Sequence, residues 1–140
     1  MIAKGNGEGC AVATLIGGKA VGFVNVSDGV RAAAFYGETL GLRMLSRDEH
    51  GMSFAVGDAL LRVTPLPDHK AGPHPLFGWD VTDISVTAKA LVDAGVSLTI
   101  YEGFGQDALG IWTAPDGSAK VAWFADPDGN VLSLTEARQA

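Results

Sequence analysis

The chain repeats a pattern of residues with a period of about 55, and this repeat constrains the fold more than any other feature. Val26-Ser27-Asp28 lies 55 residues before Val81-Thr82-Asp83, and Ala33 lies 55 residues before Ala88. Each half reads as a strand, a helix and three further strands. A half of about 50 residues buries too little apolar surface to be stably folded alone. The two halves should therefore pack together, with their sheets facing each other or joined edge to edge around a shared space.

Local signals set the expected elements of each half. In the first half, Asp28 can cap a helix and Gly41 can end it in a left-handed conformation. In the second half, Asp83 and Gly95 take the same places. The sequence predicts helices over 29–40 and 84–94, and strands at 10–16, 21–26, 42–47, 53–56, 60–65, 77–81, 97–102, 119–125 and 131–135.

These elements suggest a division of the chain into parts. We expect a flexible lead with a possible extra strand over residues 1–18, a first module over 19–67, a proline-containing linker over 68–75 and a second module over 76–140. The strand at 10–16 could form an edge or a dimer contact.

Composition excludes several classes of function. The 140 residues carry a net charge of −6, whereas proteins that bind a phosphate backbone usually present a basic face. No apolar run reaches the roughly 20 residues that cross a bilayer, and no secretory signal is visible at the start. A single cysteine, Cys10, cannot form an internal disulfide. We therefore expect a cytoplasmic protein with no nucleic-acid or membrane partner.

Three motifs point to one family. They are Ala34-Phe35-Tyr36, Thr39-Leu40-Gly41-Leu42 and, most specific of all, Asp126-Pro127-Asp128-Gly129-Asn130 between two strands. Over residues 19–136 the chain resembles the vicinal oxygen chelate superfamily, which includes glyoxalase I, bleomycin-resistance proteins, fosfomycin-resistance proteins and extradiol dioxygenases. The resemblance implies an α+β fold in which two βαβββ modules form a cupped mixed β-sheet, with helices outside and a pocket inside.

The resemblance also implies four positions for metal ligands. In this sequence they hold Val21, Arg62, Leu76 and Ser133. None of these is a good ligand, and Arg62 would repel a cation. We therefore expect no metal and no other cofactor, and metal-dependent glyoxalase or dioxygenase activity is disfavoured.

Arg62 is the strongest single candidate for contact with a ligand. In the register of the family it points into the pocket, where a guanidinium could bind a carboxylate through two hydrogen bonds. The alternative is a structural ion pair, with Asp80 as the candidate partner. Asn25 and Asp80 hold equivalent places in the two halves, and either could orient a ligand or bond to its surroundings.

Aromatic residues supply the rest of the candidate site. Trp123 shares its strand parity with Ser133 and could line the pocket, whereas Trp79 is expected to pack under the helix. Trp112 lies in a long predicted loop and could cover the pocket or cross to another chain. The predicted ligand-binding residues are Asn25, Arg62, Asp80, Trp112, Trp123 and Ser133.

Other polar residues give weaker signals. His50, His69 and His74 lie in predicted loops without regular ligand spacing. Tyr101 and Glu102 alternate on a predicted strand, so at most one of them faces the pocket, and Glu102 could act there as a general base. The sequence shows no Ser/His/Asp or Cys/His constellation.

Three functional hypotheses follow. The leading one is a metal-free protein of the bleomycin-resistance type that sequesters or carries a small organic ligand, which can be anionic. The second is a lyase, isomerase or dioxygenase that uses unusual metal ligands or acid–base chemistry. The third is a partner-binding or dimer module. Relatives often form homodimers, sometimes by exchanging modules, although two modules could also close one pocket within a monomer.

Overall fold

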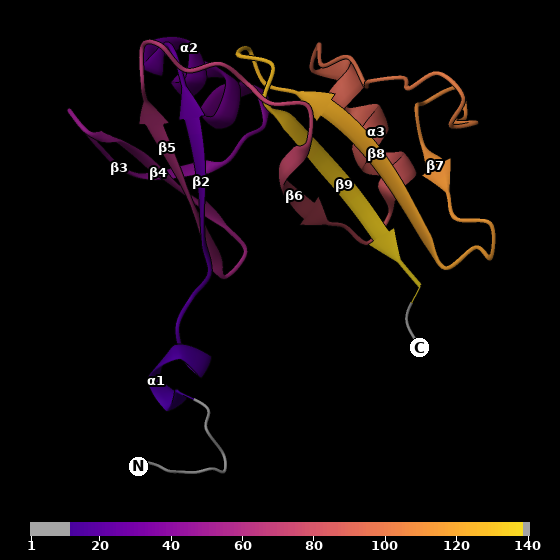
Figure 1. Cartoon of the computed structure of the whole chain (residues 1–140), viewed down its shortest axis with the longest axis horizontal. Helices are drawn as coiled ribbons and strands as arrows, with labels where there is room; N and C mark the ends of the chain where they lie inside the picture. The colour runs from indigo at the N-terminus through magenta and orange to yellow at the C-terminus, as the bar shows by residue number, and fades with distance from the viewer. Residues whose placement is uncertain (1–11, 139–140) are drawn as a thin grey trace.

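The computed structural model describes residues 12–138 and contains two four-stranded mixed sheets. The first sheet has the order β2-β5-β4-β3 and the second the order β6-β9-β8-β7 (Figure 1). In each sheet the first strand is parallel to the last strand of its half, and the other pairs are antiparallel. In chain order the elements are α1 (Ala13–Ile16), β2 (Val21–Val26), α2 (Gly29–Ala33), η1 (Ala34–Thr39), β3 (Arg43–Asp48), β4 (Gly51–Val56), β5 (Ala59–Pro65), β6 (Pro75–Asp80), α3 (Ile84–Asp93), β7 (Trp112–Thr113), β8 (Ala119–Ala125) and β9 (Val131–Ala137).

The predicted helix boundaries are confirmed by their caps. The Asp28 carboxylate accepts hydrogen bonds from the backbone N–H groups of Val30 and Arg31, and Asp83 accepts one from Val86. Gly41 and Gly95 follow the helices with φ of 75° and 93°, a conformation that costs glycine little. In the part of the chain that the structure describes, every helix falls short of the length and apolarity that a membrane span requires.

The first helix differs from the expected α-helix in its second half. Ala34–Thr39 forms a π-helix, η1, in which the Leu40 N–H donates to the Phe35 carbonyl at 2.8 Å. Such wide turns are rare and shift the faces of the helix relative to a regular α-helix. Here the shift accompanies complete burial of Tyr36, whose hydroxyl reaches into the second half of the chain.

The predicted strand at 10–16 is wrong where the structure describes it. Residues Ala13–Ile16 form the short helix α1, and Cys10 lies outside the described residues. The N–H groups of Leu15 and Ile16 donate to the Val12 carbonyl, so this backbone is bonded locally instead of to a neighbouring strand. Val12, Leu15 and Ile16 are all exposed, so the apolar run does not enter the core.

The predicted strand at 97–102 is also wrong. Only an isolated bridge between Leu98 and Phe124 forms there, and the last strand position of the second sheet is taken by Trp112–Thr113. Gln106 explains the difference, because its side-chain amide accepts from the Tyr101 N–H at 2.7 Å and donates to the Thr99 carbonyl at 2.9 Å. A side chain thus makes the hydrogen bonds that a partner strand would otherwise make.

The two sheets meet at their first strands and share one core. Figure 1 shows β2 and β6 as the inner strands, with β3 and β7 on the outside. The Phe77 ring lies against Gly22, where any side chain would collide with it. One hydrophobic cluster contains Val24 and Phe54 from the first half together with Ile84 and Leu132 from the second. The halves therefore pack edge to edge and stabilise each other, as their small size requires.

Candidate functional site

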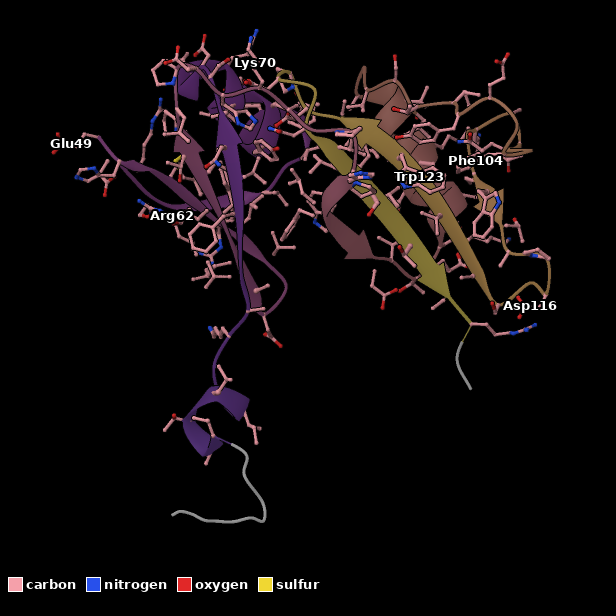
Figure 2. The ribbon with its side chains drawn as sticks, viewed as in Figure 1. Glu49, Arg62, Lys70, Phe104, Asp116 and Trp123 are labelled. Atoms are coloured by element: carbon pink, nitrogen blue, oxygen red, sulfur yellow. The ribbon has the colours of Figure 1, made fainter. Side chains whose placement is uncertain are left out.

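Each sheet has one face that packs into the core and one open face. In β5, Leu61 and Val63 are buried, so Arg62 between them points to the open face of the first sheet. In β8, Ala122 and Phe124 are buried, so Trp123 points to the open face of the second sheet. Figure 2 shows Arg62 and Trp123 on these two separate sheets.

Arg62 is held within the first sheet. Its Nη1 donates to the Ser53 hydroxyl at 3.0 Å, and its Nη2 lies 3.8 Å from the Asp48 carboxylate. The acidic neighbour of Arg62 is therefore Asp48 and not the candidate Asp80, because the hairpin of β3 and β4 brings Asp48 to the same face as Arg62. The Asp48 side chain is 57% exposed, so this long ion pair contributes little. The guanidinium has five N–H donors, and most remain available for an anion.

Trp123 forms one wall of a pocket of about 260 Å³, which we call the aromatic pocket. The rings of Tyr101 and Phe104 stand edge-on to the Trp123 ring, with centroids 5.3 and 5.9 Å away. Pro73 and Pro75 complete the lining. Aromatic and proline surfaces of this kind suit a flat, apolar ligand.

The loop that carries Tyr101 is fixed to the sheet by hydrogen bonds. The Thr99 N–H donates to the Trp123 carbonyl at 2.7 Å, and Gln106 bonds to the Tyr101 N–H and to the carbonyl of Gly110. Glu102, the candidate base, is exposed and does not line the aromatic pocket. The walls of the pocket are thus held in place before any ligand arrives.

Ser133 and Gly78 extend the open face next to Trp123. Ser133 is the direct neighbour of Trp123 on β9, and Gly78 is the neighbour of Ser133 on β6. A side chain at Gly78 would overlap the Ser133 hydroxyl. Glycine therefore allows the serine to occupy this part of the face.

The structure does not gather the other candidates around the pocket. Asn25 lies on the open face of β2, two residues after Phe23, which is paired with Arg62 on β5. Asp80 lies at the exposed end of β6, in a hollow that Glu136 also lines. Trp112 lies on β7 and pairs with Val121. Of the six predicted residues, Trp123 and Ser133 lie together, and Asn25 and Arg62 lie on the other sheet; their role in binding stays a prediction.

The four family positions for metal ligands do not form a metal site. Val21 and Leu76 offer only hydrocarbon, Arg62 is a cation and Ser133 offers one neutral hydroxyl. Among residues 12–138 there is also no group of three or more His, Cys, Asp or Glu side chains that could hold an ion. The residues present do not fit the divalent metal of the family.

A buried polar junction joins the two halves. We use this name for Tyr36, Asp126, Asn130 and His69. The Asp126 carboxylate accepts from the Tyr36 hydroxyl at 2.7 Å, from two backbone N–H groups and from the Asn130 amide at 2.8 Å. The Asn130 amide also donates to the Asn25 carbonyl, so its oxygen is left to accept from His69 Nε2. Burial, together with the nearby Asp126 carboxylate, raises the pKa of the Tyr36 hydroxyl far above its ordinary value.

Asp128 adds a second tie beside this junction. Its carboxylate accepts from the Ser27 N–H at 2.7 Å and from the Arg31 guanidinium at 3.1 Å. Partial burial opposes ionisation, but these hydrogen bonds and the Arg31 charge prevail and lower the pKa of the Asp128 carboxyl. The Asp-Pro-Asp-Gly-Asn turn thus holds the helix of the other half.

Several residues of the aromatic pocket were not singled out from the sequence. Phe104, Pro73 and Pro75 lie in segments without a regular period, so no pattern places their side chains. For Tyr101 the sequence suggests only a role in proton transfer. The clustering of aromatic and proline residues around the linker and the long loop was the one signal available.

A model of one protein family matches most of the chain. Residues 18–134 match the Glyoxalase/Bleomycin resistance protein/Dioxygenase superfamily. The chain belongs to this superfamily. The predicted family and its paired βαβββ fold are therefore confirmed. The comparison with curated proteins found no match.

Several solved structures share the fold at low sequence identity. A superfamily member from Sphaerobacter thermophilus is 23% identical, with a TM-score of 0.66 over 84% of this chain and 95% of that one. A member from Alicyclobacillus acidocaldarius is 15% identical, with a TM-score of 0.67 over 87% and 92%. TnmS3, an antibiotic binding protein from a Streptomyces species, is 24% identical, with a TM-score of 0.64 over 86% and 96%. At these identities the likeness establishes the fold alone.

Proposed function

We propose that this superfamily member binds a small organic ligand with a flat apolar part, and that it sequesters or carries the ligand without a metal. The aromatic pocket is the observation that supports this function, because three aromatic rings and two prolines line one hollow on an open sheet face. Antibiotic binding by TnmS3, a protein of the same fold, is consistent with the proposal. The four family ligand positions, which offer one neutral oxygen between them, support a metal-free mode.

We further propose that Arg62 recognises an acidic group on the ligand and that the protein is a homodimer. Arg62 does not line the aromatic pocket of its own chain. A second copy whose first sheet covers the aromatic pocket would bring Arg62 to the ligand. Val21, Phe23 and Leu76 leave apolar surface exposed on the first strands of both sheets, and a partner would cover it. With a single cysteine in the sequence, the cytoplasm remains our proposed location.

A titration with naphthalene-2-carboxylate tests the binding function. This probe joins a flat apolar ring system to one acidic group. We expect saturable binding of one probe per chain by calorimetry, unchanged by prior dialysis against a chelator. The neutral amide of the probe should bind the wild type more weakly, and Arg62→Met should remove this difference. Absence of saturable binding, or its loss after chelation, would contradict the proposal.

Replacing Phe23 by lysine tests the dimer. Phe23 is 67% exposed and is paired with Arg62 across the sheet. Burial of a lysine charge at this position against a second copy would be costly, so the substitution should prevent dimer formation. We expect the wild type to sediment at twice the 14.5 kDa of one chain and Phe23→Lys to sediment as a monomer.

The matched control is Val30→Lys, because Val30 is an equally exposed apolar residue on α2, away from the open face. Val30→Lys should remain dimeric. A wild type of single-chain mass, or a dimer that tolerates Phe23→Lys, would refute the dimer.

A further inference from the structure

A second cavity lies at the contact between the two halves, on the core side of the second sheet. It measures about 250 Å³. Leu40 and Leu42 line it from the first half, and Trp79, Leu91 and Phe124 are among the residues that line it from the second. Thr87 on α3 carries the one hydroxyl of the lining, and the Trp79 indole carries an N–H.

This cavity is separate from the aromatic pocket. Trp123 and Phe124 are consecutive in β8, so their side chains point to opposite faces of the sheet. The two pockets have no lining residue in common. A ligand in one therefore does not occupy the other.

The lining defines the chemistry of an occupant. The Trp79 and Phe124 rings stack with centroids 6.0 Å apart and an interplanar angle of 25°, which forms an aromatic wall. The Thr87 hydroxyl already donates to the Asp83 carbonyl at 3.1 Å, so it can only accept a hydrogen bond from an occupant. A charged molecule would lose its hydration without a counter-charge in this lining.

Size and access also favour occupancy. An apolar cavity of about 150 Å³ is enough to bind benzene, so this larger cavity can hold a substituted ring. Leu40, Leu42 and Trp79 are only partly buried, which leaves a route from solvent. A water molecule would find few hydrogen-bond partners in this cavity because nearly all of the lining is apolar, so an apolar molecule can displace it readily.

We propose that this cavity is a second binding site, for a compact neutral apolar molecule the size of a monocyclic aromatic with at most one hydrogen-bond donor. The donor would face Thr87. Because the occupant touches Leu40 and Leu42 as well as the second half, it also strengthens the contact between the halves. The proposal is independent of the function of the aromatic pocket.

The test uses toluene and p-cresol as probes, with the methyl resonances of Leu40, Leu91 and Leu134 as reporters. We expect saturable shifts of these resonances with both probes, and a higher melting temperature in their presence. Thr87→Phe should fill the cavity and weaken toluene binding about tenfold or more. Thr87→Val keeps the shape and should change toluene affinity less than about threefold while removing any preference for p-cresol.

Trp123→Ala separates the two sites. It should leave the toluene-induced shifts at Leu91 unchanged, whatever it does to naphthalene-2-carboxylate binding. Absence of shifts at these three leucines in the wild type, or equal toluene affinity in Thr87→Phe and Thr87→Val, would overturn the proposal. Should Thr87→Phe fail to fold, the wild-type shifts decide the question alone.

Discussion

Replacing Trp123 by alanine should weaken the binding of naphthalene-2-carboxylate about thirtyfold, which corresponds to about 2 kcal/mol. The rings of Trp123, Tyr101 and Phe104 contact one another, so removal of the Trp123 ring takes away one wall of the pocket and the support of the other two rings. Burial of the ligand against a large aromatic surface and edge-to-face contacts both contribute to this energy. Calorimetric titration of the purified variant gives the affinity.

Trp112→Ala is the matched control. Trp112 lies in the two-residue strand β7 and does not line the aromatic pocket. Its replacement should change the affinity less than about threefold. Equal losses in the two variants would show that tryptophan content or general stability, and not this pocket, governs binding.

Replacing Tyr36 by phenylalanine should lower the free energy of unfolding by about 2 kcal/mol. The Tyr36 hydroxyl is fully buried and donates to the Asp126 carboxylate across the contact between the halves. Hydrogen bonds to a charged acceptor in such surroundings are worth more than neutral ones. Urea unfolding at neutral pH measures the change.

Tyr101→Phe is the control, because it removes the other tyrosine hydroxyl of the chain, at the aromatic pocket. Its cost should stay below about 0.5 kcal/mol. Asp126→Asn should cost at least as much as Tyr36→Phe, because the amide nitrogen replaces an oxygen that accepts hydrogen bonds. A Tyr36→Phe variant as stable as the wild type would contradict the role of the junction.

The same hydroxyl predicts a dependence on pH. Because the pKa of Tyr36 is raised in the folded protein, its stabilising effect is complete below the unfolded pKa of about 10. Above that pH the unfolded chain releases the proton and the folded chain does not, so stability declines as the pH rises. The wild type should therefore lose stability between about pH 10 and 11 more steeply than Tyr36→Phe.

Much of the fold was predictable because its signals are local. The strands at 21–26 and 119–125 have the predicted bounds, and Asp28 and Asp83 cap the helices as expected. The failures arose where local hydrogen bonds that the apolar pattern does not reveal hold the backbone out of a sheet. The stretch at 97–102 has the composition of a strand, but hydrogen bonds from Gln106 hold it as a loop.

The candidate site was predictable only in part. The alternation of side chains along each strand correctly predicts that Trp123 and Ser133 share one open face, and it places Arg62 on the open face of its own sheet. Alternation cannot tell how two sheets are oriented toward each other, so the separation of Arg62 from Trp123 needed the structure. The pairing of Arg62 with Asp48 depends on the register of the hairpin of β3 and β4, which cannot be predicted from the residue pattern.

The most direct test of ligand binding at the aromatic pocket is a crystal structure of the chelator-treated protein with naphthalene-2-carboxylate. We predict electron density for the naphthalene rings in the aromatic pocket, against the rings of Trp123, Tyr101 and Phe104, with no metal ion beside it. Density for the probe at another place, or a metal ion coordinated between the probe and the protein, would contradict the account.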